Sequence, residues 1–190
     1  MNIKQMILKY LIENKQKKFS IREIAIALDI DYKPVYLNIK KLFNEGSASI
    51  EVRGNTKLCS FSEVFNGEVF NVESKRKKEL LENKDFLIMY NRLRKINKQF
   101  ILLMFGSQVN KTASKHSDID VLAIASNEEI KHIENEINLF PYNIHLTAIT
   151  YDEFIQMLKS KEFSVVSEAI KKNVLLFGTE DYYRIIENAR

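Results

Sequence analysis

The chain has 190 residues, of which 45% are hydrophobic, and it contains only 5 Gly and 2 Pro. This composition is typical of a folded, helix-rich protein of one or two domains and excludes a disordered or collagen-like chain. The single Cys59 excludes a disulfide framework and a cysteine-based zinc site. No apolar run approaches the ~18 residues of a membrane-spanning helix, and the first residues lack the pattern of a signal peptide. We therefore expect a cytoplasmic protein without a membrane partner.

The formal net charge of +4 is unevenly distributed along the chain. Residues 1–61 carry 11 Lys and Arg against 6 Asp and Glu, and residues 62–100 carry 9 against 6. Residues 101–190 carry 9 against 13. A basic front half joined to an acidic back half indicates that the front half meets a polyanion. The alternative is that these lysines only form solvated helix faces.

The first 61 residues predict three short helices followed by a β-hairpin. Apolar residues recur at helical spacing over residues 3–14. Ser20 and Glu23 have the spacing of a capping box, which begins a second helix, and Asp31 is the expected cap of a third. Two segments with alternating polarity then form the hairpin, at residues 48–53 and 57–61.

This order of elements resembles a winged helix-turn-helix domain, which we assign to residues 1–62. The resemblance implies that the third helix enters the major groove of double-stranded DNA and that the hairpin tip approaches the phosphates. The candidate DNA-binding residues are Tyr32, Lys33, Tyr36, Lys40, Lys41, Arg53, Asn55 and Lys57. Winged helices that read two half-sites commonly dimerise, so a homodimer is expected. The alternative is a module for protein–protein interaction or dimerisation.

Residues 63–98 are expected to connect this domain to the next. A basic run at residues 74–78 leads into apolar residues with helical spacing, which predict one helix over residues 77–97. We interpret the basic run as a solvated helix start, with contact to nucleic acid as the alternative.

The most informative segment follows the connection. An apolar run ends in Gly-Ser at residues 106–107, and after nine further residues Ser-Asp-Ile-Asp at 117–120 opens a second apolar run. Residues i and i+2 of a strand share one face, so Asp118 and Asp120 are expected to project together. Two such carboxylates repel unless a cation lies between them, and Mg²⁺ prefers oxygen ligands. Gly106 allows the backbone to approach a ligand closely, and amides at a following helix start favour a phosphate.

This segment resembles the signature of the minimal nucleotidyltransferases of the polymerase-beta-like superfamily, and we assign that domain to residues 99–190. The resemblance implies that ATP or another nucleoside triphosphate is bound together with Mg²⁺ or Mn²⁺. It implies that Gly106 and Ser107 hold phosphates and that Asp118 and Asp120 are metal ligands. The further candidate nucleotide-binding residues are Ser117, which precedes the aspartates, and Lys111, which compensates in part for a missing basic residue at position 108.

Active members of that family normally supply a third carboxylate from a later strand, and this chain departs from the pattern. The strand expected at the corresponding place, residues 142–149, contains no Asp or Glu, and His145 lies nearest to the expected position. An imidazole is a poorer ligand for Mg²⁺ than a carboxylate, but it can act as a base or suit Mn²⁺. The candidate catalytic residues are therefore Asp118, Asp120 and His145.

The remaining residues predict further helices and strands. Ser126 with Glu129 and Thr150 with Glu153 have the spacing of capping boxes, each of which begins a helix. The later elements are expected at residues 163–172 (helix), 174–177 (strand) and 179–189 (helix). This order gives an α+β fold class and resembles the small mixed sheet with flanking helices of the nucleotidyltransferases.

Three hypotheses for function remain open. The first is a nucleotidyltransferase with a DNA-binding winged helix, which transfers NMP to a protein, RNA or small acceptor. The second is a DNA-binding transcriptional regulator whose transferase-like domain has decayed into a nucleotide sensor or a dimerisation module. The third is an antitoxin-like partner of a separately encoded toxin, because minimal nucleotidyltransferases often work with a second small protein.

Overall fold

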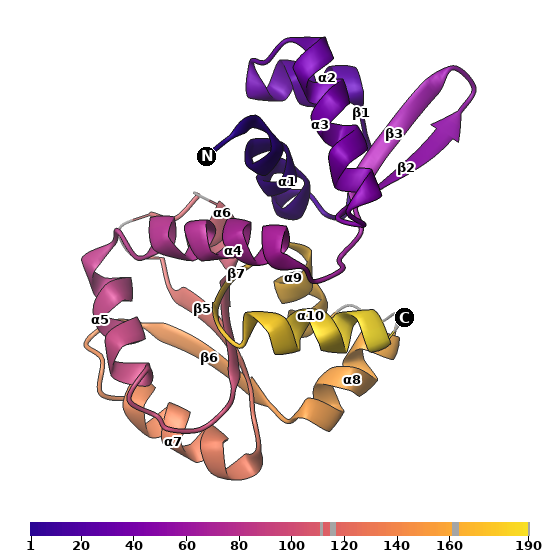
Figure 1. The fold of residues 1–190 in the computed structure, drawn as a ribbon. Coiled ribbons are helices and arrows are strands. Elements are labelled where there is room, and N and C mark those ends of the chain that lie inside the picture. Colours follow the sequence, from indigo (N-terminus) through magenta and orange to yellow (C-terminus); the bar gives the residue numbers. More distant parts are fainter. Residues whose placement is uncertain (111, 115–116, 161–163, 190) are drawn as a thin grey trace. The chain divides into compact units, whose positions relative to one another are not determined.

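The computed structural model describes residues 1–110, 112–114, 117–160 and 164–189. The chain divides into two compact units, Met1–Glu73 and Ser74–Arg190 (Figure 1). The boundary falls within the helix α4 (Gly67–Leu80). None of the helices in the described residues combines the length and the apolar character that a membrane span requires.

The first unit combines helices with an antiparallel sheet. Its elements before α4 are α1 (Ile3–Glu13), β1 (Phe19–Ser20), α2 (Ile21–Leu28), α3 (Tyr32–Asn44), β2 (Ala48–Arg53) and β3 (Thr56–Phe61). The strands follow the order β1-β3-β2. Leu11, Ile24 and Ile39 supply fully buried side chains from the three helices. The predicted helices and hairpin are confirmed within a few residues at each end.

The starts of α2 and α3 differ in how their first amides are satisfied. Ser20 Oγ accepts a hydrogen bond from the Glu23 amide at 3.2 Å, and the Glu23 carboxylate accepts one from the Ser20 amide at 2.6 Å, so the predicted capping box is confirmed. Asp31 precedes α3 but its side chain makes no capping hydrogen bond, so that prediction was wrong. The side chain of a capping residue accepts a hydrogen bond from the amide of the second or third helical residue. The third residue of α3 is Pro34, which has no N–H and cannot donate such a bond.

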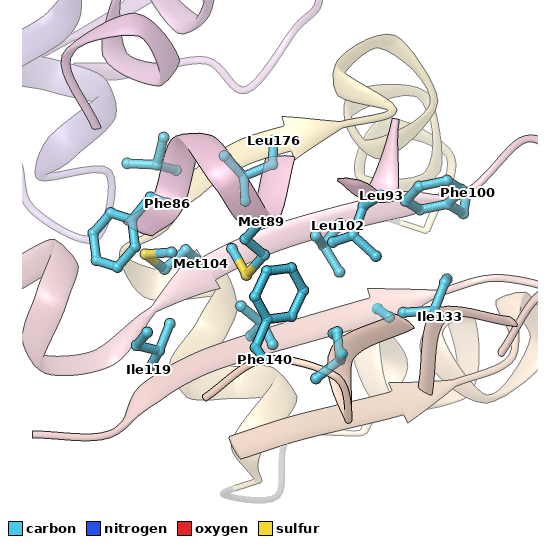
Figure 2. Close-up of a cluster of buried hydrophobic side chains, with 14 of the residues drawn as sticks. Phe86, Met89, Leu93, Phe100, Leu102, Met104, Ile119, Ile133, Phe140 and Leu176 are labelled. Atoms are coloured by element: carbon cyan, nitrogen blue, oxygen red, sulfur yellow. The ribbon is translucent and has the colours of Figure 1, made fainter. Parts of the chain in front are cut away.

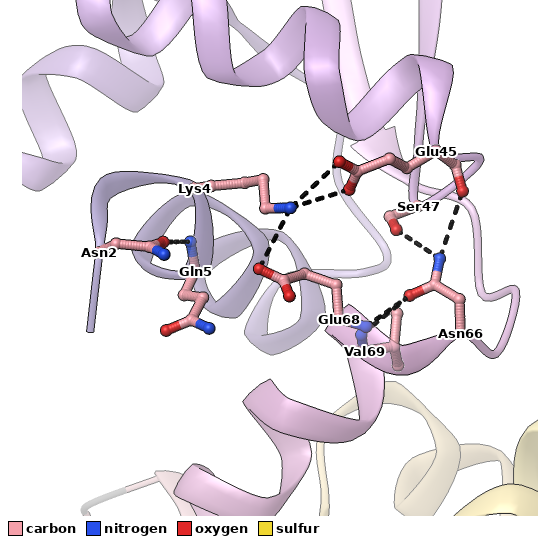
Figure 3. A network of polar contacts seen from close by, with 8 residues as sticks. All are labelled: Asn2, Lys4, Gln5, Glu45, Ser47, Asn66, Glu68 and Val69. Atoms are coloured by element: carbon pink, nitrogen blue, oxygen red, sulfur yellow. Dashed lines mark hydrogen bonds and ion pairs between the residues drawn. The ribbon is translucent and has the colours of Figure 1, made fainter.

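A polar network in the first unit joins the start of α1, the turn after α3 and the start of α4 (Figure 3). Lys4 Nζ lies 3.1 Å from both carboxylate oxygens of Glu45 and 3.3 Å from Glu68 Oε1. Desolvation opposes the charge of Lys4, but hydrogen bonds to Glu45 and Glu68 outweigh it and raise the pKa of Lys4. Asn66 donates to Ser47 Oγ at 2.7 Å and accepts from two amides at the start of α4. The segment after the hairpin is thus fixed to the first unit.

The single helix predicted over residues 77–97 was wrong, because the structure has two helices there. α4 begins earlier, at Gly67, where the Asn66 side chain caps its amides. α5 (Lys84–Leu93) begins separately after Asn83, whose Oδ1 accepts from the Asp85 amide at 2.9 Å. Asn83 lies within the apolar pattern of residues 77–97, and its capping hydrogen bond begins a new helix there.

The second unit is built on a mixed sheet flanked by helices. Its elements after α5 are β4 (Ile101–Phe105), α6 (Gly106–Asn110), β5 (Ile119–Ile124), α7 (Asn127–Ile137), β6 (Ile144–Ile149), α8 (Tyr151–Lys159), α9 (Val165–Lys171), β7 (Val174–Phe177) and α10 (Thr179–Asn188). The strands follow the order β6-β5-β4-β7. β4 pairs antiparallel with β5 and β7, and β5 pairs parallel with β6. The predicted α+β class is confirmed.

A large cluster of the core of the second unit lies against one face of this sheet (Figure 2). Leu102 and Met104 of β4 are fully buried and pack with side chains from α5, α7 and β7. The labelled members from the other elements include Phe86, Met89, Leu93, Ile133 and Leu176. Every residue of β4 is apolar and buried, so the strand itself contributes no polar side chain to a site.

Only one of the two capping boxes predicted for this unit is present. Thr150 Oγ1 accepts from the Glu153 amide at 3.3 Å, and Glu153 accepts from the Thr150 amide at 2.7 Å. Ser126 stands at the start of α7 without a side-chain capping bond, so that prediction was wrong. Glu129 is instead buried and lies 3.6 Å from Lys98 Nζ. The helix predicted over residues 163–172 appears as α9, with 163 outside the described residues.

Candidate functional site

The sheet of the second unit brings the predicted catalytic residues to one place. β4 ends at Phe105, which pairs with Asp120 on β5. Asp120 in turn lies opposite His145 on the parallel strand β6. Gly106, directly after β4, therefore lies beside Asp120, and Asp120 lies between Gly106 and His145 across the sheet. This register makes the end of β4 a candidate active site.

Gly106 lies unusually close to Asp120. The backbone of Gly106 has φ +69°, and a Cβ at this position would lie 2.1 Å from Asp120 Oδ2 and 2.9 Å from its Cγ. Real Cβ atoms essentially never approach another heavy atom closer than 3.0 Å. Only glycine therefore fits both the backbone conformation and the space. The main chain at residues 106–107 runs directly against a carboxylate.

The two aspartates flank a residue that points into the core. Ile119 is buried, whereas Asp118 is exposed and Asp120 is half-buried. This alternation matches the expected side-chain directions of a strand. One oxygen of Asp118, Oδ1, accepts a hydrogen bond from the amide nitrogen of Asn143. The Asp120 Oδ1 atom lies 3.4 Å from His145 Nδ1, and the His145 side chain is 64% exposed.

Ser117 has hydrogen-bond partners inside its own loop. Its Oγ accepts from the Ser114 amide at 2.8 Å and lies 3.1 Å from Ser114 Oγ. Its carbonyl oxygen accepts from Gln108 Nε2 at 3.4 Å. These bonds hold Ser117, the residue that precedes Asp118. Lys111, the other nucleotide-binding candidate, lies outside the described residues.

The donor set at this place suits a divalent cation but does not enclose one. In the described parts of the chain, no group of three or more His, Cys, Asp or Glu side chains is arranged to hold a metal ion. Asp118, Asp120 and His145 offer carboxylate oxygens and one imidazole nitrogen, which are ligands of Mg²⁺ and Mn²⁺. The remaining ligands of a cation bound here would come from phosphate oxygens or water, as is common for Mg²⁺.

Sequence reasoning missed Asn143 as the partner of Asp118. The signal that could have identified Asn143 is the pairing register, because Asn143 and His145 are two residues apart, as Asp118 and Asp120 are. The loop before β6 is further held by Tyr142, whose hydroxyl donates to Asp85 Oδ1 at 2.6 Å. This hydrogen bond raises the pKa of Tyr142.

Helix α3 and the hairpin of the first unit place cations around an aromatic pair. The rings of Tyr32 and Tyr36 stack with centroids 6.1 Å apart. Lys40 Nζ lies 4.9 Å from the centroid of Tyr36, and Lys57 Nζ approaches the same ring to 5.6 Å from the hairpin. A hydrogen bond with Lys40 and the charges of Lys40 and Lys57 lower the pKa of Tyr36. Beside the ring is a hollow of about 230 Å³, lined by Arg22 and by Asn55 among others.

The other predicted DNA-binding residues are less closely grouped. Lys33 and Lys41 are exposed on α3. Arg53 is exposed, but its Nε donates to Glu51 Oε1 at 2.7 Å, and Lys18 also pairs with Glu51. The hydrogen bonds from Lys18 and Arg53 lower the pKa of Glu51 to about 2. A carboxylate therefore offsets part of the positive charge at the hairpin.

The comparisons with known proteins concern the second unit. A family model described as "Nucleotidyltransferase domain" matches residues 89–175. No curated protein and no solved structure matches the chain. The matched range contains Gly106, both aspartates and His145. The chain therefore carries a nucleotidyltransferase-like domain, which confirms that part of the sequence resemblance.

Proposed function

We propose that the second unit binds a metal–nucleotide complex and transfers the NMP group of the nucleotide to an acceptor. The observation that carries the proposal is the 2.1 Å between the Cβ position of Gly106 and Asp120 Oδ2. A phosphate held by the main chain of Gly106 and Ser107 would lie against this carboxylate. Two anions share such a place when a cation lies between them, and this arrangement serves nucleotidyl transfer.

Each residue has a role in the proposed reaction. Gly106 and Ser107 hold the β and γ phosphates, while Asp118 and Asp120 bind Mg²⁺ or Mn²⁺. A divalent cation bound there reduces the charge on the triphosphate oxygens. A hydroxyl of a protein, RNA or small acceptor attacks the α-phosphorus, the α–β phosphoanhydride bond breaks, and pyrophosphate leaves in line. His145 lies beside Asp120 and serves either as the acceptor of the hydroxyl proton or as a metal ligand, in which case the proton passes to solvent water.

The test of this function is transfer of label from an α-labelled nucleotide in Mg²⁺ or Mn²⁺. The acceptors are the protein itself and total cellular RNA. We expect the 190-residue chain to transfer label and the variant Asp118→Asn/Asp120→Asn to transfer none, because the metal ligands are lost. A matched variant, Glu134→Gln/Glu187→Gln, removes two exposed carboxylates of the same unit and should transfer as the wild type does.

Two other outcomes would contradict transfer. Absence of label, together with nucleotide binding that needs metal and both aspartates, would make the domain a nucleotide sensor, as in the regulator hypothesis. Absence of both transfer and nucleotide binding would leave this domain as a scaffold, and the first unit would then carry the function.

A second proposal concerns the first unit. We propose that this unit is a winged helix-turn-helix domain that binds double-stranded DNA through α3 and the hairpin. The support is that Lys40 of α3 and Lys57 of the hairpin both lie over the ring of Tyr36, so the two elements bring their positive charges to the same place. The excess of Lys and Arg in residues 1–61 also favours a polyanion. Antitoxin-like action and a homodimer stay predictions.

DNA binding is tested by the salt dependence of affinity for a random-sequence duplex. We expect Lys40→Ala/Lys57→Ala to weaken binding and to reduce the slope of log K against log salt by up to about 2, because each lost phosphate contact contributes about 0.9. The control Lys131→Ala/Lys159→Ala removes the same charge from exposed positions of the other unit and should bind as the wild type. Equal weakening in both variants, or no binding of the wild type at low salt, would contradict the DNA proposal.

A further inference from the structure

Asn143, directly before strand β6, and His145 within it present nitrogen-bearing side chains to the two aspartates. Asp120 lies opposite His145, and Ile119 lies opposite Ile144, in the parallel pairing of β5 with β6. The Ile119 amide donates to the Asn143 carbonyl at 2.9 Å, which extends the alignment by one residue before the first paired residue of β6. The segment beside the carboxylate pair therefore offers an amide and an imidazole in register with it.

The contacts of these two side chains differ in kind. Asn143 donates its amide hydrogen to Asp118 Oδ1, so it orients that carboxylate and leaves the other oxygen for a ligand. His145 Nδ1 lies 3.4 Å from Asp120 Oδ1. Two ligand atoms at about 2.1 Å from one octahedral ion lie about 3 Å apart, so a small adjustment allows this pair of atoms to share a cation.

The chemistry of an imidazole beside two carboxylates discriminates between cations. Mg²⁺ prefers oxygen ligands, whereas imidazole nitrogen is a better ligand for the first-row transition metals. Mn²⁺ accepts such a nitrogen and still suits carboxylate, water and phosphate oxygens. Within the described residues, Asp118 and Asp120 are the two carboxylates of this site, and two carboxylates attract Mg²⁺ less strongly by charge than three would.

We infer that His145 is a metal ligand that gives the site a preference for Mn²⁺ over Mg²⁺, and that Asn143 is a positioning residue for Asp118. The inference rests on the proposed metal–nucleotide site and specifies its cation. It assigns to His145 the role of ligand in place of the role of proton acceptor.

The test is electron paramagnetic resonance of Mn²⁺ with the 190-residue chain and ATP. We expect bound Mn²⁺ with ¹⁴N modulation in the spin-echo envelope, and displacement only by Mg²⁺ in excess of about tenfold. His145→Asp should lose the nitrogen modulation and reduce the preference for Mn²⁺ by about tenfold. The control His132→Asp changes an exposed histidine of α7 and should keep both properties.

Asn143→Ala separates positioning from ligation. We expect its Mn²⁺ affinity to fall by about tenfold, which is typical when a group that orients a ligand is removed, while the nitrogen modulation remains. Unchanged affinity would overturn the role of Asn143.

The result that overturns the role of His145 is bound Mn²⁺ without nitrogen modulation, or an unchanged cation preference in His145→Asp. Either result leaves the proposed metal–nucleotide function intact. Failure of the wild type to bind Mn²⁺ and ATP at all would overturn both the inference and that function.

Discussion

Gly106→Ala is expected to abolish binding of the metal–nucleotide complex and to lower the free energy of unfolding by about 1–2 kcal/mol from the left-handed backbone alone. The new methyl group would occupy space that is 2.1 Å from Asp120 Oδ2, so the carboxylate must turn away. A turned carboxylate no longer meets a cation held against residues 106–107. Calorimetric titration with ATP and Mn²⁺ measures the binding, and urea denaturation measures the stability.

Gly54→Ala is the matched control for the stability that is lost when alanine replaces a glycine with left-handed backbone. Gly54 has φ +57°, and a Cβ there would have no neighbour within 4 Å. This variant should lose a similar amount of stability in the first unit and keep its nucleotide affinity. Wild-type nucleotide affinity in Gly106→Ala would mean that the phosphates do not lie against Asp120, and the proposed site would be wrong.

Leu102→Ala is expected to destabilise the second unit by about 2–5 kcal/mol, the usual cost of this truncation in a core. Leu102 is fully buried on β4, between α5, α7 and the sheet (Figure 2). The surrounding side chains come from several elements and cannot all move into the cavity. Because the chain has two units, hydrogen exchange read from peptides of the second unit is the appropriate measurement.

Leu139→Ala makes the same chemical change at a surface position. Leu139, which follows α7, is 59% exposed, so the expected change in stability is within about 0.5 kcal/mol. Equal destabilisation by the two leucine variants would contradict the arrangement of the core described above.

Capping patterns in the sequence predicted the helix starts correctly where residues close together in the chain make all the hydrogen bonds. The capping boxes at Ser20 and Thr150 formed as predicted, because each satisfies its own first amides through a partner three residues away. The same pattern failed at Ser126, since Glu129 is buried and lies near Lys98 instead of the helix start. Asp31 makes no capping bond either, and Pro34 removes one of the two amides that such a cap could bond.

The candidate site was predictable to the extent that it lies on one segment of the chain. The alternation of Asp118, Ile119 and Asp120 follows from the two-residue period of a strand, and the family match covers the same segment. Gly106 lies close to Asp120 because β4 and β5 pair antiparallel. The sequence motif on these two strands resembles the signature of nucleotidyltransferases.

The sequence by itself determined the class of the second domain, the glycine turn and the carboxylate pair. Only the tertiary structure decided that Asn143 holds Asp118, that His145 faces Asp120, and that Lys57 joins Lys40 over Tyr36. These contacts join residues that are far apart in the chain. Their formation depends on strand register and helix packing, which result from many weak interactions distributed over each unit and leave no local pattern to read.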